Sequence, residues 1–230
     1  MYIIIAGAGL LGRNVAAKLS ASKQDVVVID KNPEITEFIY ERLGVVAISG
    51  DATNINTLID AGIEKTDVVV GAMRSDADNL SLTVISKSFG VPRIYARMRD
   101  PAYKSVYEIA GVTDTINVVE LSASPLVFEI EEPEMKIAYT YRGGKGVIAI
   151  IRIPADSPIV DNTVAQIASD DRFPSDCLIT GIYRKEEDEF FIPRGNRKIF
   201  AGDEVFITAP VESVRKAAIF IGIKGRIKLK

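Results

Sequence analysis

The chain has 230 residues, no histidine, and a formal net charge of −3 from 28 Lys and Arg against 31 Asp and Glu. The lack of histidine excludes His-based metal sites and Ser-His or Cys-His nucleophile pairs, and the one cysteine, Cys177, excludes an internal disulfide. No apolar run reaches the roughly 18 residues that cross a bilayer, and the chain begins with a strand rather than a signal peptide. We therefore expect a cytoplasmic protein in which Cys177 is a buried thiol.

The charge is shared unevenly along the chain. Residues 1–134 carry 12 Lys and Arg against 19 Asp and Glu, net −7, and residues 135–230 carry 16 against 12, net +4. This difference suits two domains with different surfaces, and it is too small for the strongly basic face of a nucleic-acid-binding protein. No nucleic-acid partner is expected.

The first 120 residues alternate apolar runs with helical patterns. The runs predict strands at Tyr2–Ala6, Asp25–Ile29, Val45–Ser49, Asp67–Gly71, Arg93–Arg97 and Thr115–Val118. The patterns between them predict helices at Leu10–Ser20, Pro33–Leu43, Ile55–Ala61, Asp76–Phe89 and Pro101–Ala110. Because strands joined by helices pair in parallel through right-handed crossovers, the expected fold is an α/β, Rossmann-like doubly wound sheet of about six strands.

From Leu121 the pattern changes. A short helix is expected through Ile130, and the acid and proline cluster Glu131–Glu134 that follows is typical of a linker. The later part predicts strands at Ile137–Arg142, Val147–Ile153, Cys177–Arg184, Phe190–Ile192 and Glu204–Ala209, with helices at Val164–Ser169 and Val211–Phe220. The expected division is a nucleotide-binding domain at 1–120, a linker or crossover helix at 121–135, and a small α+β domain at 136–230.

Three glycines follow the first strand at the spacing of a phosphate-binding turn. Gly7 suits the tight turn, Gly9 lets the backbone approach a phosphate, and Gly12 lets the helix pack against the strand. Free N–H groups at the helix start then attract the phosphate charge. The alternative is a structural turn without a ligand.

Asp30 closes the second apolar run, about 20 residues after the glycines, where an acid accepts hydrogen bonds from ribose hydroxyls. A carboxylate there repels a 2′-phosphate. The pattern therefore favours NAD(H) or an adenosine nucleotide over NADP.

Other polar residues follow the later strands. Asp51 either accepts a hydrogen bond from an adenine amino group or caps the next helix. Arg13 either contacts a terminal phosphate or lies in solvent. Arg74 likewise either contacts a phosphate or is an ordinary surface residue. Of Arg97 and Arg99, one is expected to meet a phosphate or a partner subunit and the other to lie on the surface.

The sequence contains no Walker A motif, because Gly143–Gly146 lacks the Ser or Thr and the helix that the motif needs. No lysine or tyrosine pair stands out where a nicotinamide would lie. An enzyme that transfers hydride is therefore disfavoured, and an NAD-dependent oxidoreductase with an unidentified substrate remains the alternative function.

Together these segments resemble the TrkA-type (TrkA/KtrA) regulatory subunits of potassium transporters and channels, which carry an RCK N-terminal and an RCK C-terminal domain. The first-domain resemblance rests on residues 6–12 (AGAGLLG), 28–30 (VID), 50–53 (GDAT), 78–79 (DN), 94–97 (IYAR) and 119–120 (VE). The second-domain resemblance rests on residues 153–158 (IPADSP), 179–184 (ITGIYR), 192–195 (IPRG) and 201–206 (AGDEVF). The resemblance covers essentially the whole chain.

The resemblance implies a non-enzymatic regulatory subunit that self-associates into dimers and a higher ring. The ring would lie in the cytoplasm at the inner face of the cell membrane, below a TrkH- or KtrB-like potassium-translocating subunit. Nucleotide exchange would change the shape of the ring and so gate ion flux. Because the chain has one copy of each domain, whereas some members have two, the ring needs more subunits.

The resemblance also implies the ligands: NAD(H), ATP or ADP, with AMP as a further candidate. The residues implied to hold them are Gly7, Gly9, Leu10, Leu11, Gly12, Arg13, Asp30, Lys31, Asp51, Ala52, Thr53, Ala72, Met73, Arg74, Asn79 and Arg97. Glu120 matches a position that assists a divalent cation at the dimer interface, although a surface carboxylate is the alternative. Some relatives bind a cyclic dinucleotide in the second domain, which no residue here decides.

The tail at 224–230 is basic and amphipathic. It is expected to be a solvated last strand, with contact to anionic lipid or to the membrane subunit as the alternative.

Overall fold

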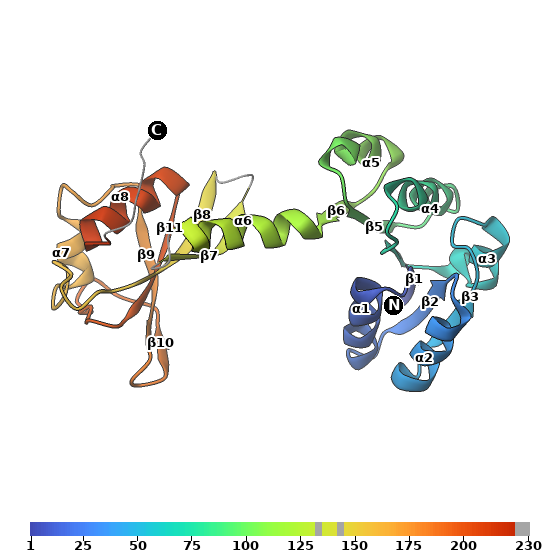
Figure 1. Ribbon diagram of the computed structural model, residues 1–230, viewed down its shortest axis with the longest axis horizontal. Helices are drawn as coiled ribbons and strands as arrows, with labels where there is room; N and C mark the ends of the chain where they lie inside the picture. Colours follow the sequence, from blue (N-terminus) through green and yellow to red (C-terminus); the bar gives the residue numbers. More distant parts are fainter. Residues whose placement is uncertain (132–134, 142–144, 224–230) are drawn as a thin grey trace. The chain divides into compact units, whose positions relative to one another are not determined.

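The computed structural model describes residues 1–131, 135–141 and 145–223. The chain divides into two compact units, Met1–Leu121 and Ser122–Lys230 (Figure 1), and each is described by itself. The expectations for the linker cluster at 132–134, for Gly143 and Gly144 and for the tail at 224–230 lie outside the described residues.

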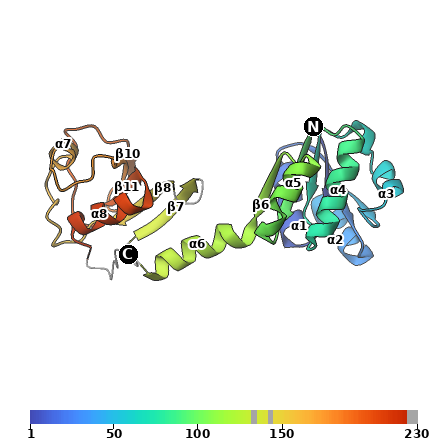
Figure 2. The ribbon, with the colours of Figure 1, turned by 90° about the horizontal axis from the view of Figure 1, so that it is seen from above.

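The first unit is a six-stranded sheet with helices on both faces (Figure 2). Its strands are β1 (Tyr2–Ala6), β2 (Asp25–Asp30), β3 (Val46–Ser49), β4 (Val68–Gly71), β5 (Arg93–Met98) and β6 (Asp114–Asn117). Its helices are α1 (Leu10–Ala21), α2 (Pro33–Leu43), α3 (Ile55–Asp60), α4 (Asp76–Ser88) and α5 (Lys104–Ala110), with short 3-10 helices η1 (Ile63–Lys65) and η2 (Pro101–Tyr103). All neighbouring strands are parallel in the order β3-β2-β1-β4-β5-β6, which confirms the expected Rossmann-like fold.

Alternate residues of the central strand enter different cores. Ile3 and Ile5 of β1 pack with residues of α1 and α2, whereas Ile4 and Ala6 pack with residues of α3 and α4. Because successive strand side chains point to opposite faces, a strand covered by helices on both faces is apolar throughout. The continuous apolar run that begins the chain has this cause.

The end of the sheet differs from the sequence-based expectation. The expected strand ran to Val118 and the expected helix began at Leu121, but β6 ends at Asn117 and helix α6 (Val118–Glu131) follows at once. The Asn117 side-chain oxygen accepts a hydrogen bond from the Glu120 backbone N–H at 3.0 Å, as an N-cap does. Glu120 therefore lies in the first turn of a helix rather than in a loop after a strand.

Further elements of the first unit differ in detail. The expected helix at 101–110 is the 3-10 helix η2 followed by α5, and η1 was not expected. The strand expected from Asp67 begins at Val68, although Asp67 itself contacts β1: its carboxylate accepts a hydrogen bond from the Tyr2 backbone N–H at 2.8 Å.

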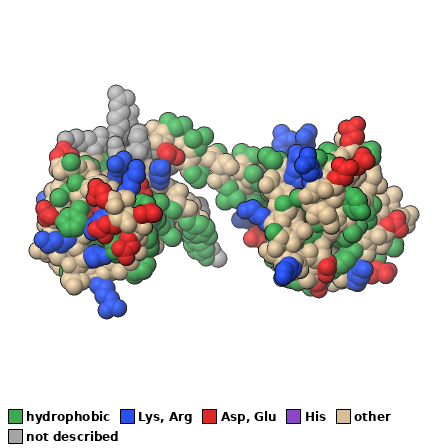
Figure 3. All heavy atoms as spheres, turned by 90° about the horizontal axis from the view of Figure 1, so that it is seen from below, with side chains coloured by type: hydrophobic (Ala, Val, Ile, Leu, Met, Phe, Trp, Pro, Cys, Tyr) green, Lys and Arg blue, Asp and Glu red, His purple; other side chains and the backbone are tan. Residues whose placement is uncertain are grey.

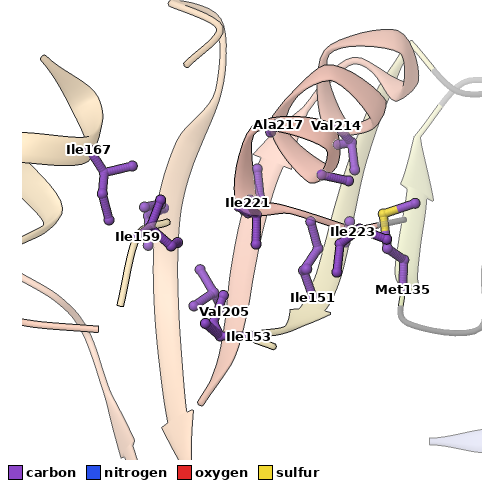
Figure 4. Close-up of a cluster of buried hydrophobic side chains, with 14 of the residues drawn as sticks. Met135, Ile151, Ile153, Ile159, Ile167, Val205, Val214, Ala217, Ile221 and Ile223 are labelled. Carbon is purple, nitrogen blue, oxygen red and sulfur yellow. The ribbon is translucent and has the colours of Figure 1, made fainter. Parts of the chain in front are cut away.

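The second unit is a five-stranded antiparallel sheet with helices, which confirms the expected α+β domain. Its strands are β7 (Met135–Tyr141), β8 (Gly146–Arg152), β9 (Leu178–Arg184), β10 (Glu189–Phe191) and β11 (Glu204–Ala209), and its helices are α7 (Val164–Ala168) and α8 (Val211–Ile221). Figure 4 shows α8 residues, Val214, Ala217 and Ile221 among them, meeting strand residues such as Ile151 and Val205. The spacing of these α8 residues places them on one helix face.

Cys177 lies beside this core, where it is partly buried and packs against the apolar cluster. Burial, aided by the nearby Asp176 carboxylate, raises the pKa of the thiol to about 11. The expectation of a buried thiol is thus met in part, since some of the residue remains accessible.

The described residues of the second unit include a buried ion pair, Arg184 with Asp203. The Arg184 side chain is 9% exposed and that of Asp203 is 2% exposed, and they meet at 2.8 Å between Nε and Oδ1. A second bond joins Arg184 Nη2 to Asp203 Oδ2 at 3.0 Å, and Oδ2 also accepts the Phe200 backbone N–H at 2.9 Å. The bidentate pair therefore ties β9 to the turn before β11.

We expect Asp203→Ala to lower the free energy of unfolding by about 3 to 5 kcal/mol, because the buried Arg184 guanidinium loses both bonds to its buried partner and keeps only the half-exposed Glu187 carboxylate, at 3.3 Å, as an ion-pair partner. Urea denaturation of the full chain measures this. Glu212→Ala is the control, since Glu212 pairs with Arg215 while its side chain is 64% exposed; it should change the value by less than about 1 kcal/mol. Equal effects of the two substitutions would contradict the prediction.

Candidate functional site

A cleft of about 820 Å³ lies in the first unit, where the strands end at their carboxyl side. Open parallel sheets bind ligands at this edge, at the point where the strand order reverses, which here is between β1 and β4. The cleft is lined by Gly7, Gly9, Leu10, Leu11, Asn14, Ile29, Asp30, Lys31, Ile35, Gly50, Ala52, Ala72, Met73, Arg74, Asp78, Arg97 and Val118.

The three glycines of the first turn have different steric requirements. Gly7 has a φ of +95°, and a Cβ added there would lie 2.9 Å from the Met73 backbone nitrogen. A Cβ on Gly12 would overlap the carbonyl oxygen of Gly7, so the helix cannot approach the turn with any other residue. Gly9 has no atom within 4 Å of an added Cβ, which leaves the space beside it open.

Helix α1 begins without a side-chain cap among the described residues. Its N-cap is Gly9, and no acidic residue lies in its first turn. Helices α2, α3 and α4 instead begin at Asn32, Asn54 and Ser75, whose side chains accept backbone N–H groups. The start of α1 thus keeps unsatisfied N–H groups and the positive end of the helix dipole beside the cleft, which together suit an anion.

Asp30 holds the glycine turn as well as lining the cleft. Its Oδ2 accepts the Ala8 backbone N–H at 2.7 Å, and its Oδ1 accepts the Asn32 N–H at 2.9 Å. A carboxylate has about four lone-pair positions, so these two bonds leave acceptor capacity for a ligand hydroxyl.

Asp51 is engaged by its own loop and by Lys31. Its Oδ1 accepts from the Thr53 backbone N–H at 2.9 Å and from the Thr53 hydroxyl at 2.7 Å. Its Oδ2 lies 3.1 Å from the Lys31 ammonium. The Thr53 bonds, aided by Lys31, lower the pKa of the Asp51 carboxyl. The cap of α3 is Asn54 rather than Asp51, so the capping alternative for Asp51 is wrong.

Two arginines line the cleft from neighbouring loops, Arg74 after β4 and Arg97 at the end of β5. In the described part of the chain neither guanidinium makes an ion pair. Their charge is therefore available to a ligand in the cleft. Arg99, the alternative to Arg97, does not line the cleft but lies at a separate, open depression with Arg74.

Most of the residues implied to hold a nucleotide come together in the cleft. Five lie outside its lining: Gly12, Arg13, Asp51, Thr53 and Asn79. Gly12 lies behind the turn, and Arg13 is exposed on the first turn of α1. Asn79 is 1% exposed in α4.

Sequence reasoning did not assign six lining residues: Asn14, Ile29, Ile35, Gly50, Asp78 and Val118. Helical spacing offers a signal for Asn14, because residues three or four apart share a helix face and Asn14 follows Leu10 and Leu11 at that distance. Ile29 and Ile35 resemble core residues in sequence. Val118 carries no signal, because it lines the cleft only through the path of the chain after β6.

Glu120 is exposed in the first turn of α6. No cluster of three or more Asp, Glu or Cys side chains that suits a metal ion occurs within residues 1–131, 135–141 and 145–223. In the same residues, no helix combines the length and the apolar character needed to cross a membrane.

Two domain families match the chain. The TrkA-N domain matches residues 3–118 and the TrkA-C domain matches residues 148–222. A Trk system potassium uptake protein TrkA homolog of Archaeoglobus fulgidus is 33% identical over 218 residues, which cover 93% of this chain and 48% of that protein. A second such homolog, from Methanothermobacter thermautotrophicus, is 25% identical over 94% of this chain and 97% of its own length. The chain thus spans about half of the first relative and nearly all of the second.

Solved structures share the fold. The RCK domain of GsuK has a TM-score of 0.68 and 17% identity, covering 96% of this chain and 47% of that one. The GsuK channel bound to NAD has a TM-score of 0.66 and 16% identity, with 96% and 39% covered. The Kef C-terminal domain of Shewanella denitrificans in an AMP-bound form has a TM-score of 0.51 and 26% identity, with 56% and 79% covered.

We expect Gly12→Ala to lower the free energy of unfolding by about 2 to 3 kcal/mol, because the new Cβ overlaps the Gly7 carbonyl oxygen. Gly9→Ala is the matched control: its φ of −62° is ordinary and its surroundings are open. It should change stability by about 1 kcal/mol or less. Denaturant unfolding of both variants measures the difference, and similar losses would contradict this account of the turn.

Proposed function

The chain belongs to the TrkA family, and from this premise we propose that it is a nucleotide-binding regulatory subunit that gates a membrane potassium transporter or channel. The relatives named above are potassium uptake proteins. The first part of this proposal is that the chain binds a nucleotide, and this part rests on the geometry of the cleft.

The uncapped start of α1 beside the open space at Gly9 is the observation that carries the proposal. We place a phosphate of the ligand against the N–H groups of Leu10, Leu11 and Gly12, where the helix dipole adds to the attraction. NAD(H) and ATP or ADP are the proposed ligands, with AMP as a further candidate. One neighbour of known structure holds NAD and another holds AMP, which supports this class of ligand.

The other cleft residues suit the rest of such a ligand. Asp30 has acceptor capacity for ribose hydroxyls, and its charge disfavours a 2′-phosphate. Arg74 and Arg97 are proposed to meet further phosphate oxygens, as is Arg13 if it turns back from the surface. Asp51 is proposed to accept a hydrogen bond from the adenine amino group. It would use the carboxylate lone pairs that the bonds to Thr53 and Lys31 leave unoccupied.

We propose a regulatory rather than a catalytic role. The chain contains no histidine, the side chain that most often transfers protons near neutral pH. Sustained oxidation of NADH with any substrate would instead support the alternative, an NAD-dependent oxidoreductase.

Self-association is proposed from the exposed apolar side chains of α5 and α6. Val119, Leu121, Leu126, Val127 and Ile130 of α6 are each more than half exposed. Figure 3 shows hydrophobic side chains gathered along this segment. A helix that is apolar on several sides is normally buried, so a second subunit is the proposed cover, and Glu120 is proposed to complete a divalent-cation site there.

Gating then follows from linkage. A ligand shifts a two-state assembly only through its different affinity for the two states. We propose that the assembly is a ring in the cytoplasm, at the inner face of the membrane and in contact with a TrkH- or KtrB-like subunit, and that the members of each nucleotide pair favour different states.

Calorimetry and thermal shifts with NAD, NADH, NADP, ATP, ADP and AMP test nucleotide binding. We expect NAD(H) or ATP and ADP to raise the melting temperature, since a ligand of the folded state stabilises it, and we expect NADP to have the smallest effect. Arg13→Ala should weaken ATP about tenfold or more and leave AMP unchanged, because it removes a contact to the terminal phosphate. Lys18→Ala, which removes a positive charge from the last turn of α1, is the control and should change neither.

The regulatory part is tested by small-angle scattering of the assembly and by potassium flux through vesicles that contain the membrane subunit. We expect ATP and ADP, or NADH and NAD, to give different scattering profiles and opposite changes in flux. Identical profiles and identical flux with both members of each pair, at saturation, would overturn the gating proposal.

A further inference from the structure

Three buried side chains lie behind the cleft and join its loops. Asp76 and Asn79 of α4 are 9% and 1% exposed, and Tyr107 of α5 is 0% exposed. None of them lines the cleft. We refer to Asp76, Asn79 and Tyr107 as the clamp.

Asn79 connects the loop after β4 to the end of β5. Its Oδ1 accepts the Met73 backbone N–H at 3.2 Å, and its Nδ2 donates to the carbonyl oxygens of Met73 at 3.1 Å and Arg97 at 3.0 Å. Both N–H donors of the amide are therefore used within the protein. Gly71 makes room for this contact, because a Cβ there would lie 2.9 Å from Asn79 Oδ1.

Asp76 and Tyr107 contact the backbone at the same strand end. The Asp76 carboxylate accepts the backbone N–H groups of Arg99 at 2.9 Å and Asp100 at 3.0 Å. The Tyr107 hydroxyl lies 3.1 Å from Asp76 Oδ1 and 3.3 Å from the Arg97 carbonyl oxygen. Burial and the Asp76 charge raise the pKa of Tyr107, so the hydroxyl stays a donor at any ordinary pH.

The clamp thus contacts the backbone near both arginines that line the cleft. It contacts Arg97 directly, and it contacts Met73, the residue before Arg74. Arg97 itself accepts two clamp hydrogen bonds through its carbonyl, and Arg74 follows Met73 in the chain. The clamp also ends on α5, whose outer side carries Val106 at 46% exposure and Ile109 at 87% exposure. The cleft and α5 are therefore joined through these hydrogen bonds, beside the apolar packing of Tyr107 with Ala96 and Met98 of β5.

We propose that Asp76, Asn79 and Tyr107 are positioning residues. They fix the Met73–Arg74 loop and the end of β5 relative to each other, and they transmit the effect of ligand binding in the cleft to α5. A ligand that draws Arg74 or Arg97 toward its phosphates pulls on the Met73 and Arg97 backbone. Asn79 and Tyr107 follow those groups, because a buried polar group that loses its partner is costly. Tyr107 carries the restraint into α5.

This inference rests on the proposed nucleotide site, and its test distinguishes a failure of the inference from a failure of the proposed function. Hydrogen exchange of the full chain is measured with and without saturating ATP, and separately with NAD. In the wild type we expect the bound nucleotide to slow exchange at residues 9–14, by direct contact, and about tenfold at residues 104–110, through the clamp. Tyr107→Phe removes only the hydroxyl, and it should keep the protection at 9–14 while abolishing the protection at 104–110.

Tyr40→Phe is the matched control, because Tyr40 is 66% exposed on α2, away from the clamp, and it should behave as the wild type. Asp76→Asn is a second variant that keeps the side-chain volume and should also uncouple α5, which guards against poor folding of Tyr107→Phe. Two results would overturn the inference. One is that nucleotide protects residues 9–14 but not 104–110 in the wild type. The other is that it protects 104–110 in both clamp variants as strongly as in the wild type. If neither nucleotide binds the wild type, the proposed function fails, and the inference with it.

Discussion

The close approach of three backbone segments at the first turn is the constraint on which the first unit depends. Gly7 lies against the backbone of Met73, and Gly12 lies against the carbonyl of Gly7. No side chain fits at either contact, so α1 packs directly onto the turn and the turn directly onto the loop after β4. The same contacts leave the start of α1 facing the cleft without a cap.

The electrostatics of the cleft follow from this arrangement. Positive charge comes from the helix start and from Lys31, Arg74 and Arg97, and negative charge comes from Asp30 and Asp78. Asp30 also accepts the Ala8 N–H, so the residue that suits a ribose also shapes the turn that suits a phosphate. A ligand that contacts both the helix start and Asp30 would therefore contact the two groups that define the turn.

The two units have different means of cohesion. The first relies on apolar residues that alternate between two helical layers, and the clamp adds buried polar bonds on the β5 side of the sheet. The second has one apolar core on one face of an antiparallel sheet, with the Arg184–Asp203 pair at its border. Helix α6 carries apolar side chains that are more than half exposed, and the proposed self-association rests on them.

Local patterns were enough to predict the α/β fold, the parallel sheet, the small second domain and the glycine turn. Each of these depends on a signal carried within a few residues: period-two or continuous apolar runs, helix caps, and the Gly7, Gly9 and Gly12 spacing. The start of α6 was missed because the Asn117 side chain caps a helix where the apolar run predicts that the strand continues.

The tertiary structure was needed to distinguish the residues that face the cleft from those that support it. Asn79 follows β4 in sequence as a ligand-binding residue would, but its amide forms hydrogen bonds with the Met73 and Arg97 backbone instead. Val118 lines the cleft only because β6 ends where it does, and Tyr107 meets Asp76 from 31 residues away. Sequence spacing gives the strand end on which a residue lies, but the direction of its side chain depends on contacts between segments far apart in the chain.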